Sequence, residues 1–283
     1  MQGVNQPILS GKCPVNPHWN TRFKNYAFAG TLSEELRNAF RDAEALLQQS
    51  DLIKNSRSTT AGIFVVNGRE FFIKRSNVNS FSERLRRIGR LSRAERNMQM
   101  AAELEKIGIL TPKVYMALRT GAWFLPGASY LITDYFPGAM TVSDNLAELC
   151  ATPEKWQKTV EGLTGIVLKM HQNGIEHGDL KLCNLMAVKQ PGGDFRLGVF
   201  DLDGSVKRAA ACSNKVRASD LARMISSTYI FMNKAQLAAP EDLSRIAALW
   251  TGSYRKAGGM DFYSDKYFRI KMRKFLPDVP ALR

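Results

Sequence analysis

The stretch HGDLKLCNLM, residues 177–186, carries three polar side chains at a characteristic spacing. Asp179 follows His177 by two positions, and Asn184 follows Asp179 by five. A second stretch, VFDLDGSV (199–206), is an apolar run that ends at Asp201. Alone, VFDLDGSV fits two opposite phosphate chemistries. Asp201 could be the nucleophile of a phosphatase with Asp203 as its acid/base, or it could hold magnesium while ATP gives up a phosphate.

Composition sets the limits on both chemistries. The chain has 283 residues, of which 45% are hydrophobic and 23% charged, as in ordinary globular proteins. No apolar run is long enough to cross a bilayer, and the N-terminal residues lack the pattern of a signal peptide. Cys13, Cys150, Cys183 and Cys212 are scattered, which favours reduced thiols in the cytoplasm. The formal charge of +14 predicts an anionic partner.

The periodicity of the chain changes along its length. Strand patterns and one β-hairpin, turning at Asn67-Gly68, dominate the first half, whereas helical patterns dominate the second half. We predict an α+β protein with an N-terminal extension and strand-rich lobe in residues 1–137 and a helical lobe in residues 138–283. The predicted helices are 32–49, a segment ending near Gly108, a helix that starts at Thr152-Pro153-Glu154 and ends by Gly174, and most of the chain after Ser219. The predicted strands include 113–119 and 129–136.

The order H-x-D-x-x-x-x-N, followed by a strand with a terminal Asp, resembles the catalytic pattern of protein kinases. The chain resembles kinase-fold small-molecule kinases, and most closely the lipopolysaccharide core kinases that phosphorylate heptose or Kdo sugars. The resemblance covers roughly residues 57–230. It implies a bilobal protein-kinase-like fold, with ATP and magnesium bound between the lobes.

The resemblance assigns a role to each polar residue of the two stretches. Asp179 would orient the acceptor hydroxyl and accept its proton, and Lys181 would steady the transferring phosphate. Asn184 and Asp201 would hold magnesium through hard oxygen ligands. His177 would orient the loop backbone without titrating in the reaction.

Upstream, the kinase pattern requires a lysine on a strand and a glutamate on the next helix. Lys74, at the end of REFFIKR, is the predicted phosphate-positioning lysine. Glu95 is its predicted partner and Glu103 the alternative. Ser92 and Glu95 also have the spacing of a capping box, so Glu95 could simply cap its helix.

The sequence departs from protein kinases in three places. No G-x-G-x-x-G precedes the hairpin, and only SRSTTAG (56–62) could cover the phosphates. Phe72 stands where a small residue usually lies over adenine, which leaves the nucleotide preference open. Gly178 replaces the arginine that senses a phosphorylated activation loop, and no A-P-E triplet follows. We therefore expect a kinase that is constitutively active on a small or lipid-linked substrate.

Two alternatives to a kinase make different demands on the sequence. A haloacid-dehalogenase-type phosphatase would need VFDLDGSV on the first strand of a doubly wound sheet, and an acidic pair later, for which GGMDFYSD (258–265) is the candidate. A pseudokinase that only binds a partner would need none of the kinase residues. Asp220 could brace the catalytic loop, or it could be an N-terminal helix acid beside a capping Ser219. His171 is expected in the core at a helix end.

The remaining expectations concern the acceptor. By resemblance, it is an inner-core lipopolysaccharide sugar, phosphorylated at the cytoplasmic face of the inner membrane; an aminoglycoside-like molecule or a protein remains an alternative. One basic run is predicted to contact an anionic substrate or membrane surface. Nucleic acid is not expected, because no recognition helix or RNA-binding signature is present. The run consists of Arg84, Arg86, Arg87, Arg90, Arg93 and Arg96.

Overall fold

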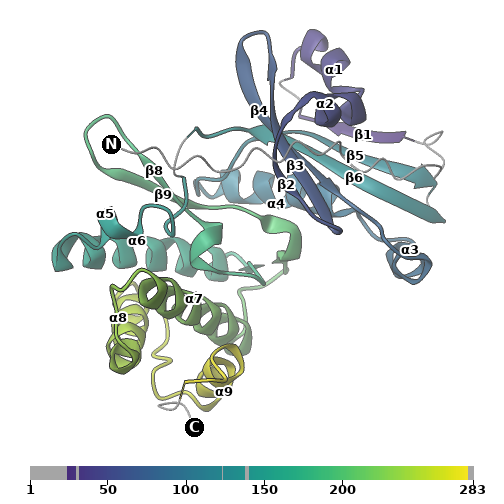
Figure 1. The fold of residues 1–283 in the computed structure, drawn as a ribbon. Helices are drawn as coiled ribbons and strands as arrows, with labels where there is room; N and C mark the ends of the chain where they lie inside the picture. The colour runs from purple at the N-terminus through teal and green to yellow at the C-terminus, as the bar shows by residue number, and fades with distance from the viewer. Residues whose placement is uncertain (1–23, 30–31, 123, 138–139, 280–283) are drawn as a thin grey trace. The chain divides into compact units, whose positions relative to one another are not determined.

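The structure, a computed structural model, describes residues 24–29, 32–122, 124–137 and 140–279. Backbone contacts divide the chain into two compact units. The first comprises residues 1–99 and 112–135, and the second comprises residues 100–111 and 136–283. Figure 1 shows strands dominating the first unit and helices dominating the second. Cys13 lies outside the described residues, whereas Cys150, Cys183 and Cys212 are free thiols.

The first unit contains a six-stranded antiparallel sheet with the order β1-β5-β6-β4-β3-β2. The predicted hairpin is confirmed, because β3 and β4 pair throughout and turn at Asn67 and Gly68, which both have positive φ. The expected strands 113–119 and 129–136 correspond to β5 and β6. The strands are β1 (Lys24–Phe28), β2 (Asp51–Asn55), β3 (Thr59–Val66), β4 (Arg69–Ser76), β5 (Val114–Ala122) and β6 (Leu125–Asp134).

Two short helices, α1 (Glu34–Phe40) and α2 (Ala43–Gln49), replace the single helix predicted over 32–49. The prediction was wrong at Asp42, which leaves helical geometry and caps α2 by accepting a hydrogen bond from the Ala45 N–H. The apolar periodicity survives the break. Phe40 and Leu47 are fully buried in one cluster with Phe71 of β4. The helices therefore cover one face of the sheet.

The basic segment forms α3 (Phe81–Arg87) and the start of α4 (Arg93–Lys106). Gly89 and Gly108, both with positive φ, follow these helices. Arg84 is buried. The six arginines of the predicted run therefore do not form one exposed surface, because the helix places one of them against the interior.

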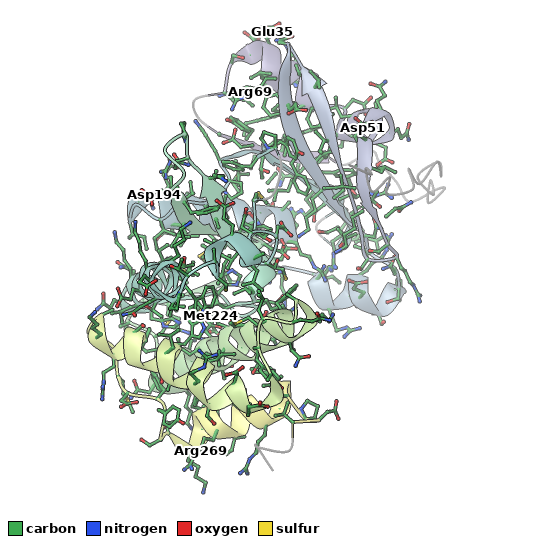
Figure 2. The ribbon with its side chains drawn as sticks, turned by 60° about the vertical axis from the view of Figure 1, so that its left-hand side comes forward. Glu35, Asp51, Arg69, Asp194, Met224 and Arg269 are labelled. Carbon is green, nitrogen blue, oxygen red and sulfur yellow. The ribbon has the colours of Figure 1, made fainter. Side chains whose placement is uncertain are left out.

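The second unit is built around α6 (Pro153–Gln172), which Thr152 caps by accepting from the Lys155 N–H, as predicted. Trp250 and Met224 are fully buried in this unit, and Figure 2 shows Met224 within its interior. The other helices are α5 (Leu146–Leu149), α7 (Asn214–Lys234), α8 (Leu243–Lys256) and α9 (Lys266–Phe275). The short strands are β7 (Ile175–Glu176), β8 (Leu185–Lys189), β9 (Phe195–Val199) and β10 (Val206–Lys207), and the 3-10 turns are Leu182–Asn184, Leu202–Gly204 and Pro240–Asp242.

Three details of this unit bear on the sequence predictions. Helix α7 begins at Asn214, so the alternative with Ser219 as a cap and Asp220 as an N-terminal acid was wrong. Strand β9 pairs with β8 in a two-stranded hairpin and is not part of a doubly wound sheet. In the 258–265 segment, Asp261 pairs with Arg255 and Asp265 caps α9, so both carboxylates have structural partners. The phosphatase reading therefore lacks its fold.

Among the described residues, no helix combines the length and the apolar character needed to span a bilayer.

Candidate active site

Asn184 and Asp201 come together through the hairpin of β8 and β9. Leu185 pairs with Val199, and the Phe200 N–H donates to the Asn184 carbonyl at 3.1 Å. Asn184 therefore ends the turn that enters β8, and Asp201 directly follows the residue bonded to it. Asp201 adopts a left-handed backbone conformation with φ 57°. Few non-glycine residues have this geometry, and it marks a constrained site.

The Asp179 carboxylate is surrounded by donors. Lys181 Nζ lies 2.9 Å from Oδ2, and Arg223 Nη1 lies 3.1 Å from Oδ1. Asn184 Nδ2 donates to the Asp179 carbonyl at 2.9 Å and reaches Oδ2 at 3.4 Å. Three predicted site residues, Asp179, Lys181 and Asn184, are thus in direct contact. Asp179 and Lys181 remain more than one third exposed, so solvent and substrate can reach them.

Asp220 of α7 braces the backbone of the loop that contains His177, Gly178 and Asp179. Its carboxylate accepts from the His177 N–H at 2.9 Å and from the Gly178 N–H at 3.1 Å. His171 Nε2 lies 3.4 Å from the same carboxylate, and Tyr254 contacts the other ring nitrogen of His171. Burial alone would raise the pKa of Asp220, but the His171 contact and the His177 N–H outweigh burial and lower it. The bracing interpretation of Asp220 and the core placement of His171 are confirmed.

His177 links the loop to the Asp201 segment. Its Nε2 lies 3.1 Å from the Phe200 carbonyl, which can only accept, so Nε2 carries the proton. The Ser205 hydroxyl donates to the His177 carbonyl at 3.1 Å. Nδ1 is buried without a hydrogen-bond partner among the described residues, and burial lowers the pKa of His177. A neutral imidazole that orients the backbone agrees with the predicted role.

The backbone geometry at position 178 explains why glycine stands where protein kinases have arginine. The φ of Gly178 is +78°, and a Cβ at this position would lie 2.7 Å from the Gly204 carbonyl. The loop at residues 177–184 and the loop after Asp201 therefore approach each other too closely for any side chain at this point. Packing therefore explains why no arginine side chain is present at this position.

Lys74 lies on β4, where side chains alternate between the two faces of the sheet. Phe71 and Ile73 belong to the core cluster with Phe40 and Leu47, so Phe72 and Lys74 point to the face away from α1 and α2. Both side chains are half-buried. Phe72 and Lys74 thus share one face of the sheet.

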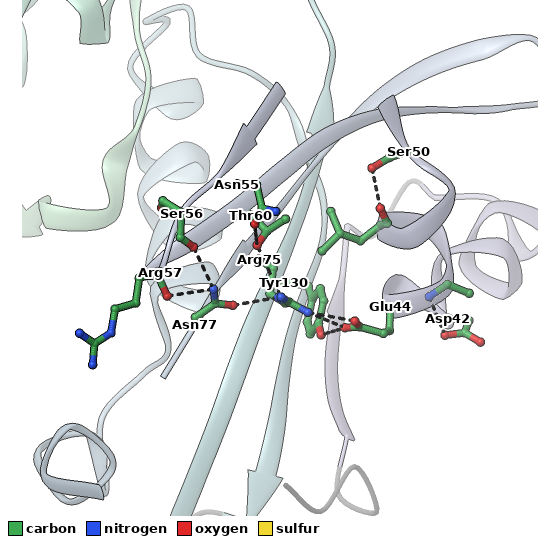
Figure 3. A network of polar contacts seen from close by, with 12 residues as sticks. Asp42, Glu44, Ser50, Asn55, Ser56, Arg57, Thr60, Arg75, Asn77 and Tyr130 are labelled. Atoms are coloured by element: carbon green, nitrogen blue, oxygen red, sulfur yellow. Dashed lines mark hydrogen bonds and ion pairs between the residues drawn. The ribbon is translucent and has the colours of Figure 1, made fainter. Parts of the chain in front are cut away.

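Arg75, next to Lys74, organises a buried network on the opposite face (Figure 3). Its Nη1 lies 2.9 Å from Glu44 of α2, whose carboxylate also accepts from the Tyr130 hydroxyl. Its Nε donates to Asn77 at 2.8 Å, and Asn77 in turn donates to the Arg57 carbonyl at 3.1 Å. The network ties the strand of Lys74 to the turn at residues 56–58, which belongs to the predicted phosphate-covering segment.

Glu95 closes a capping box. Its Oε2 accepts from the Ser92 N–H at 2.7 Å, while the Ser92 hydroxyl accepts from the Glu95 N–H at 3.2 Å. Glu103, the alternative partner of Lys74, contacts Lys106 and lies 3.8 Å from Lys207. The pairing of Lys74 with Glu95 stays a prediction.

The donor set fits a magnesium ion held mainly by a nucleotide. The described residues contain no group of three or more His, Cys, Asp or Glu able to form a metal cage. Mg²⁺ usually keeps several waters and takes only one or two protein oxygens together with phosphates. Because Asn184 commits Nδ2 to Asp179, its Oδ1 is oriented as an acceptor, and Asp201 supplies a carboxylate.

Arg223 is the site residue that sequence reasoning missed. It lies three positions after Asp220 in α7, so both side chains leave the same helix face toward the catalytic loop. The signal was present in the helical spacing, but it depended on knowing that Asp220 lies inside the helix.

Comparisons with known proteins agree with this geometry. The model of the lipopolysaccharide kinase (Kdo/WaaP) family matches residues 43–247, more than half of the chain. The chain belongs to this family. A similar solved structure is "WaaP in complex with acyl carrier protein", with a TM-score of 0.55 and 22% identity; the match covers 83% of this chain and 98% of that one. Comparison with curated proteins gave no match.

The lipopolysaccharide kinase therefore has the predicted α+β, bilobal protein-kinase-like fold. Its family consists of phosphotransferases that act on sugar hydroxyls of the lipopolysaccharide core with a nucleotide as phosphate donor. The family assigns the acceptor class and leaves the choice between heptose and Kdo open.

Proposed function

We propose that this lipopolysaccharide kinase transfers the γ-phosphate of ATP to a hydroxyl of an inner-core sugar, a heptose or Kdo. The observation that carries the proposal is the Asp179 carboxylate, which is reachable from solvent and held by Lys181 and Arg223. A buried brace from Asp220 keeps its loop rigid. This arrangement suits a carboxylate that must stay ionised and correctly oriented.

In the proposed reaction, Asp179 accepts the proton of the acceptor hydroxyl as its oxygen bonds to the γ-phosphorus. The bond between that phosphorus and the β–γ bridging oxygen breaks, and ADP leaves. Lys181, now 2.9 Å from Asp179, moves its charge toward the transferring phosphate. Such positioning and charge stabilisation supply most of the catalysis in phosphoryl transfer.

The residues predicted from the kinase pattern would position the nucleotide. Lys74 contacts the phosphates, with Glu95 as its proposed partner, and Phe72 lies over the base. Asn184 and Asp201 would hold Mg²⁺, which neutralises charge on the triphosphate when bound. Retention of all these residue types argues against a pseudokinase, since a binding module needs none of them.

We place the reaction at the cytoplasmic face of the inner membrane, with α3 in peripheral contact with lipid. Four large apolar side chains, Phe81, Leu85, Ile88 and Leu91, are 64%, 50%, 36% and 45% exposed. Phe81 and Leu85 lie one helical turn apart on the same face of α3. Arg86 and Arg90 are exposed beside them. Apolar side chains flanked by arginines fit an anionic membrane interface.

Sedimentation with vesicles containing anionic lipid tests this contact. The double variant Phe81→Ser/Leu85→Ser is expected to lose vesicle binding. Ile53→Ser/Val65→Ser is the matched control, since Ile53 and Val65 are 59% and 60% exposed on the sheet. Equal binding by both variants would contradict the assignment of α3.

The function itself is tested by incubating the protein with ATP, magnesium and purified lipopolysaccharide core, and reading the glycolipid by mass spectrometry. We expect one added phosphate, located by fragment ions on a heptose or on Kdo. Asp201→Asn should lose the product. Transfer to a protein or aminoglycoside but not to any core acceptor would overturn the proposal.

A further inference from the structure

Helix α9 is an unusually basic element of the second unit. Its ten residues, KYFRIKMRKF, include five cations and no carboxylate. Lys266 and Arg269 occupy its N-terminal half, where the helix dipole makes positive charge unfavourable. Like charges three and four positions apart also repel on a helix surface. Arg273 and Lys274 lie in the last turn, where the dipole favours cations, so helix stability accounts for these two residues but not for Lys266 and Arg269.

The charges of α9 face outward because its apolar side is committed to α7. Phe268 and Met272 are buried, and the Ser226 hydroxyl of α7 contacts Met272 Sδ at 3.4 Å. Figure 2 shows Arg269 at the periphery of the second unit. The exposed side carries Ile270, which is 49% exposed, and four exposed cations around it, Lys266, Arg269, Arg273 and Lys274, which we name the α9 basic face.

The α9 basic face differs from most of the cationic surface of its unit. Arg255 pairs with Asp261, Lys256 with Glu161, and five other cations have carboxylate partners of their own. These are Lys158, Lys189, Lys207, Arg208 and Arg245. None of the four side chains of the α9 basic face has an ion-pair or hydrogen-bond partner in the part of the chain that the structure describes. Their charge is available to an external anion.

The helix is also in contact with the catalytic loop through Arg223. The Arg223 guanidinium stacks over the Phe275 ring of α9 at 4.4 Å, while its Nη1 lies 3.1 Å from Asp179. Phe275 directly follows Arg273 and Lys274 in the sequence. One chain of contacts thus runs from the carboxylate that meets the acceptor hydroxyl to the end of the α9 basic face.

We propose that Arg223 and the α9 basic face bind the anionic groups of the acceptor, the carboxylates and phosphates of the lipopolysaccharide core. The inference rests on the proposed function of Asp179. Arg223 would meet the anionic group nearest the reacting hydroxyl, and α9 would meet groups on the adjoining sugars. Arginine suits both, because its fork of donors matches carboxylate and phosphate oxygens.

Steady-state kinetics with a de-O-acylated core acceptor tests the proposal without a lipid surface. Arg269→Gln/Arg273→Gln should raise KM for this acceptor at least about fivefold, with kcat and KM for ATP unchanged. In the native protein, added salt should raise the same KM, and the variant should respond less. Lys155→Gln/Lys234→Gln removes two exposed charges from α6 and α7 and should leave KM unchanged.

Arg223 is tested separately as a specificity-determining residue. Arg223→Gln should raise KM for the intact acceptor, and the increase should shrink for an acceptor whose carboxylates are reduced to alcohols. Arg223→Lys should recover part of the affinity. An equal increase for both acceptors would mean that Arg223 only positions Asp179.

The outcomes separate this inference from the proposed function. If the native protein transfers phosphate but the α9 variant keeps a native KM, only the inference fails. If KM changes only for acylated acceptor in vesicles, the face binds anionic lipid, and the proposal is overturned. Calorimetric binding of the de-O-acylated acceptor gives the same contrast without turnover, so an inactive preparation still tests it.

Discussion

The catalytic loop of the second unit and the Lys74 strand of the first hold their polar side chains in different ways. In the loop, Asp179, Lys181 and Asn184 lie within six positions and contact one another directly. A short sequence motif therefore contains all three of these residues. Distant residues also hold the loop from outside the motif, since Asp220 binds its backbone and Arg223 contacts Asp179.

On β4, neighbouring side chains point to opposite faces of the sheet. Lys74 points to one face of the sheet, while Arg75 points to the other and binds Glu44, 31 positions away. The contact between Arg75 and Glu44 does not follow from a local motif. A local motif was thus enough to group the loop residues, whereas the contact of Arg75 with Glu44 joins separate elements and requires the fold.

The largest expected effect follows from removing the brace. Asp220→Asn replaces one acceptor oxygen with an amide that faces the donors of His177, Gly178 and His171. Buried groups left unsatisfied cost about 1–3 kcal/mol each, so we expect a loss of about 3 kcal/mol in the free energy of unfolding. Chemical denaturation measures it.

The rate of phosphate transfer should also fall in Asp220→Asn, because the loop loses its brace. Asp194→Asn is the matched control, because Asp194 is 81% exposed in a surface ion pair with Lys158. Its effect should be within about 0.5 kcal/mol. An equally mild Asp220→Asn would show that the loop does not depend on its distant brace.

Gly178→Ala tests the close approach of the two loops. A Cβ would press on the Gly204 carbonyl at a positive φ, which we expect to cost about 1–3 kcal/mol of stability and most of the transfer activity. Gly192→Ala is the control, since nothing lies within 4 Å of its Cβ position. Native activity in Gly178→Ala would remove the packing explanation for this glycine.

These contacts also show how far the sequence could be interpreted. The spacing of Asp179, Asn184 and Asp201 predicted that these residues cluster, and the structure brings Asp179 and Asn184 into contact because the motif and the hairpin after it are both local. The break at Asp42 was missed because a side-chain cap interrupts a helix without changing its apolar period. Arg223 and the α9 basic face were missed because their importance depends on which helix surfaces are buried.

Glu95→Gln tests the predicted pairing of Glu95 with Lys74 in the first unit. Glutamine preserves the hydrogen bond to the Ser92 N–H, as a capping box requires, but removes the charge that would pair with Lys74. We expect at least about a tenfold loss of transfer with unchanged stability, equivalent to about 1.4 kcal/mol of activation free energy. Full activity would leave Glu95 as a helix cap and direct attention to Glu103.

The smallest effect is a pH dependence of stability. The folded state lowers the pKa of His177 below its ordinary value of 6.5, so the unfolded state binds a proton first as the pH falls. The free energy of unfolding should therefore decrease below about pH 6.5, with a slope of at most about 1.4 kcal/mol per pH unit for one proton.

Denaturation at pH 7.5 and pH 5.5 should show a smaller difference in His177→Gln than in the native protein. Titration of the Asp220 carboxylate does not contribute to the stability difference between pH 7.5 and pH 5.5. Its lowered pKa contributes stability above its ordinary value of 3.8 that is lost only below that pH. Identical pH slopes in both proteins would show that His177 is not held neutral.

The most direct test of the account measures ATP affinity and phosphate transfer on the same Asp179→Asn protein. If Asp179 accepts the acceptor proton, ATP binding should stay within about twofold of the native value, while transfer to lipopolysaccharide core falls by about 10²–10⁴-fold. Transfer at the native rate would contradict the assignment of Asp179 and, with it, the catalytic role of the loop at residues 177–184.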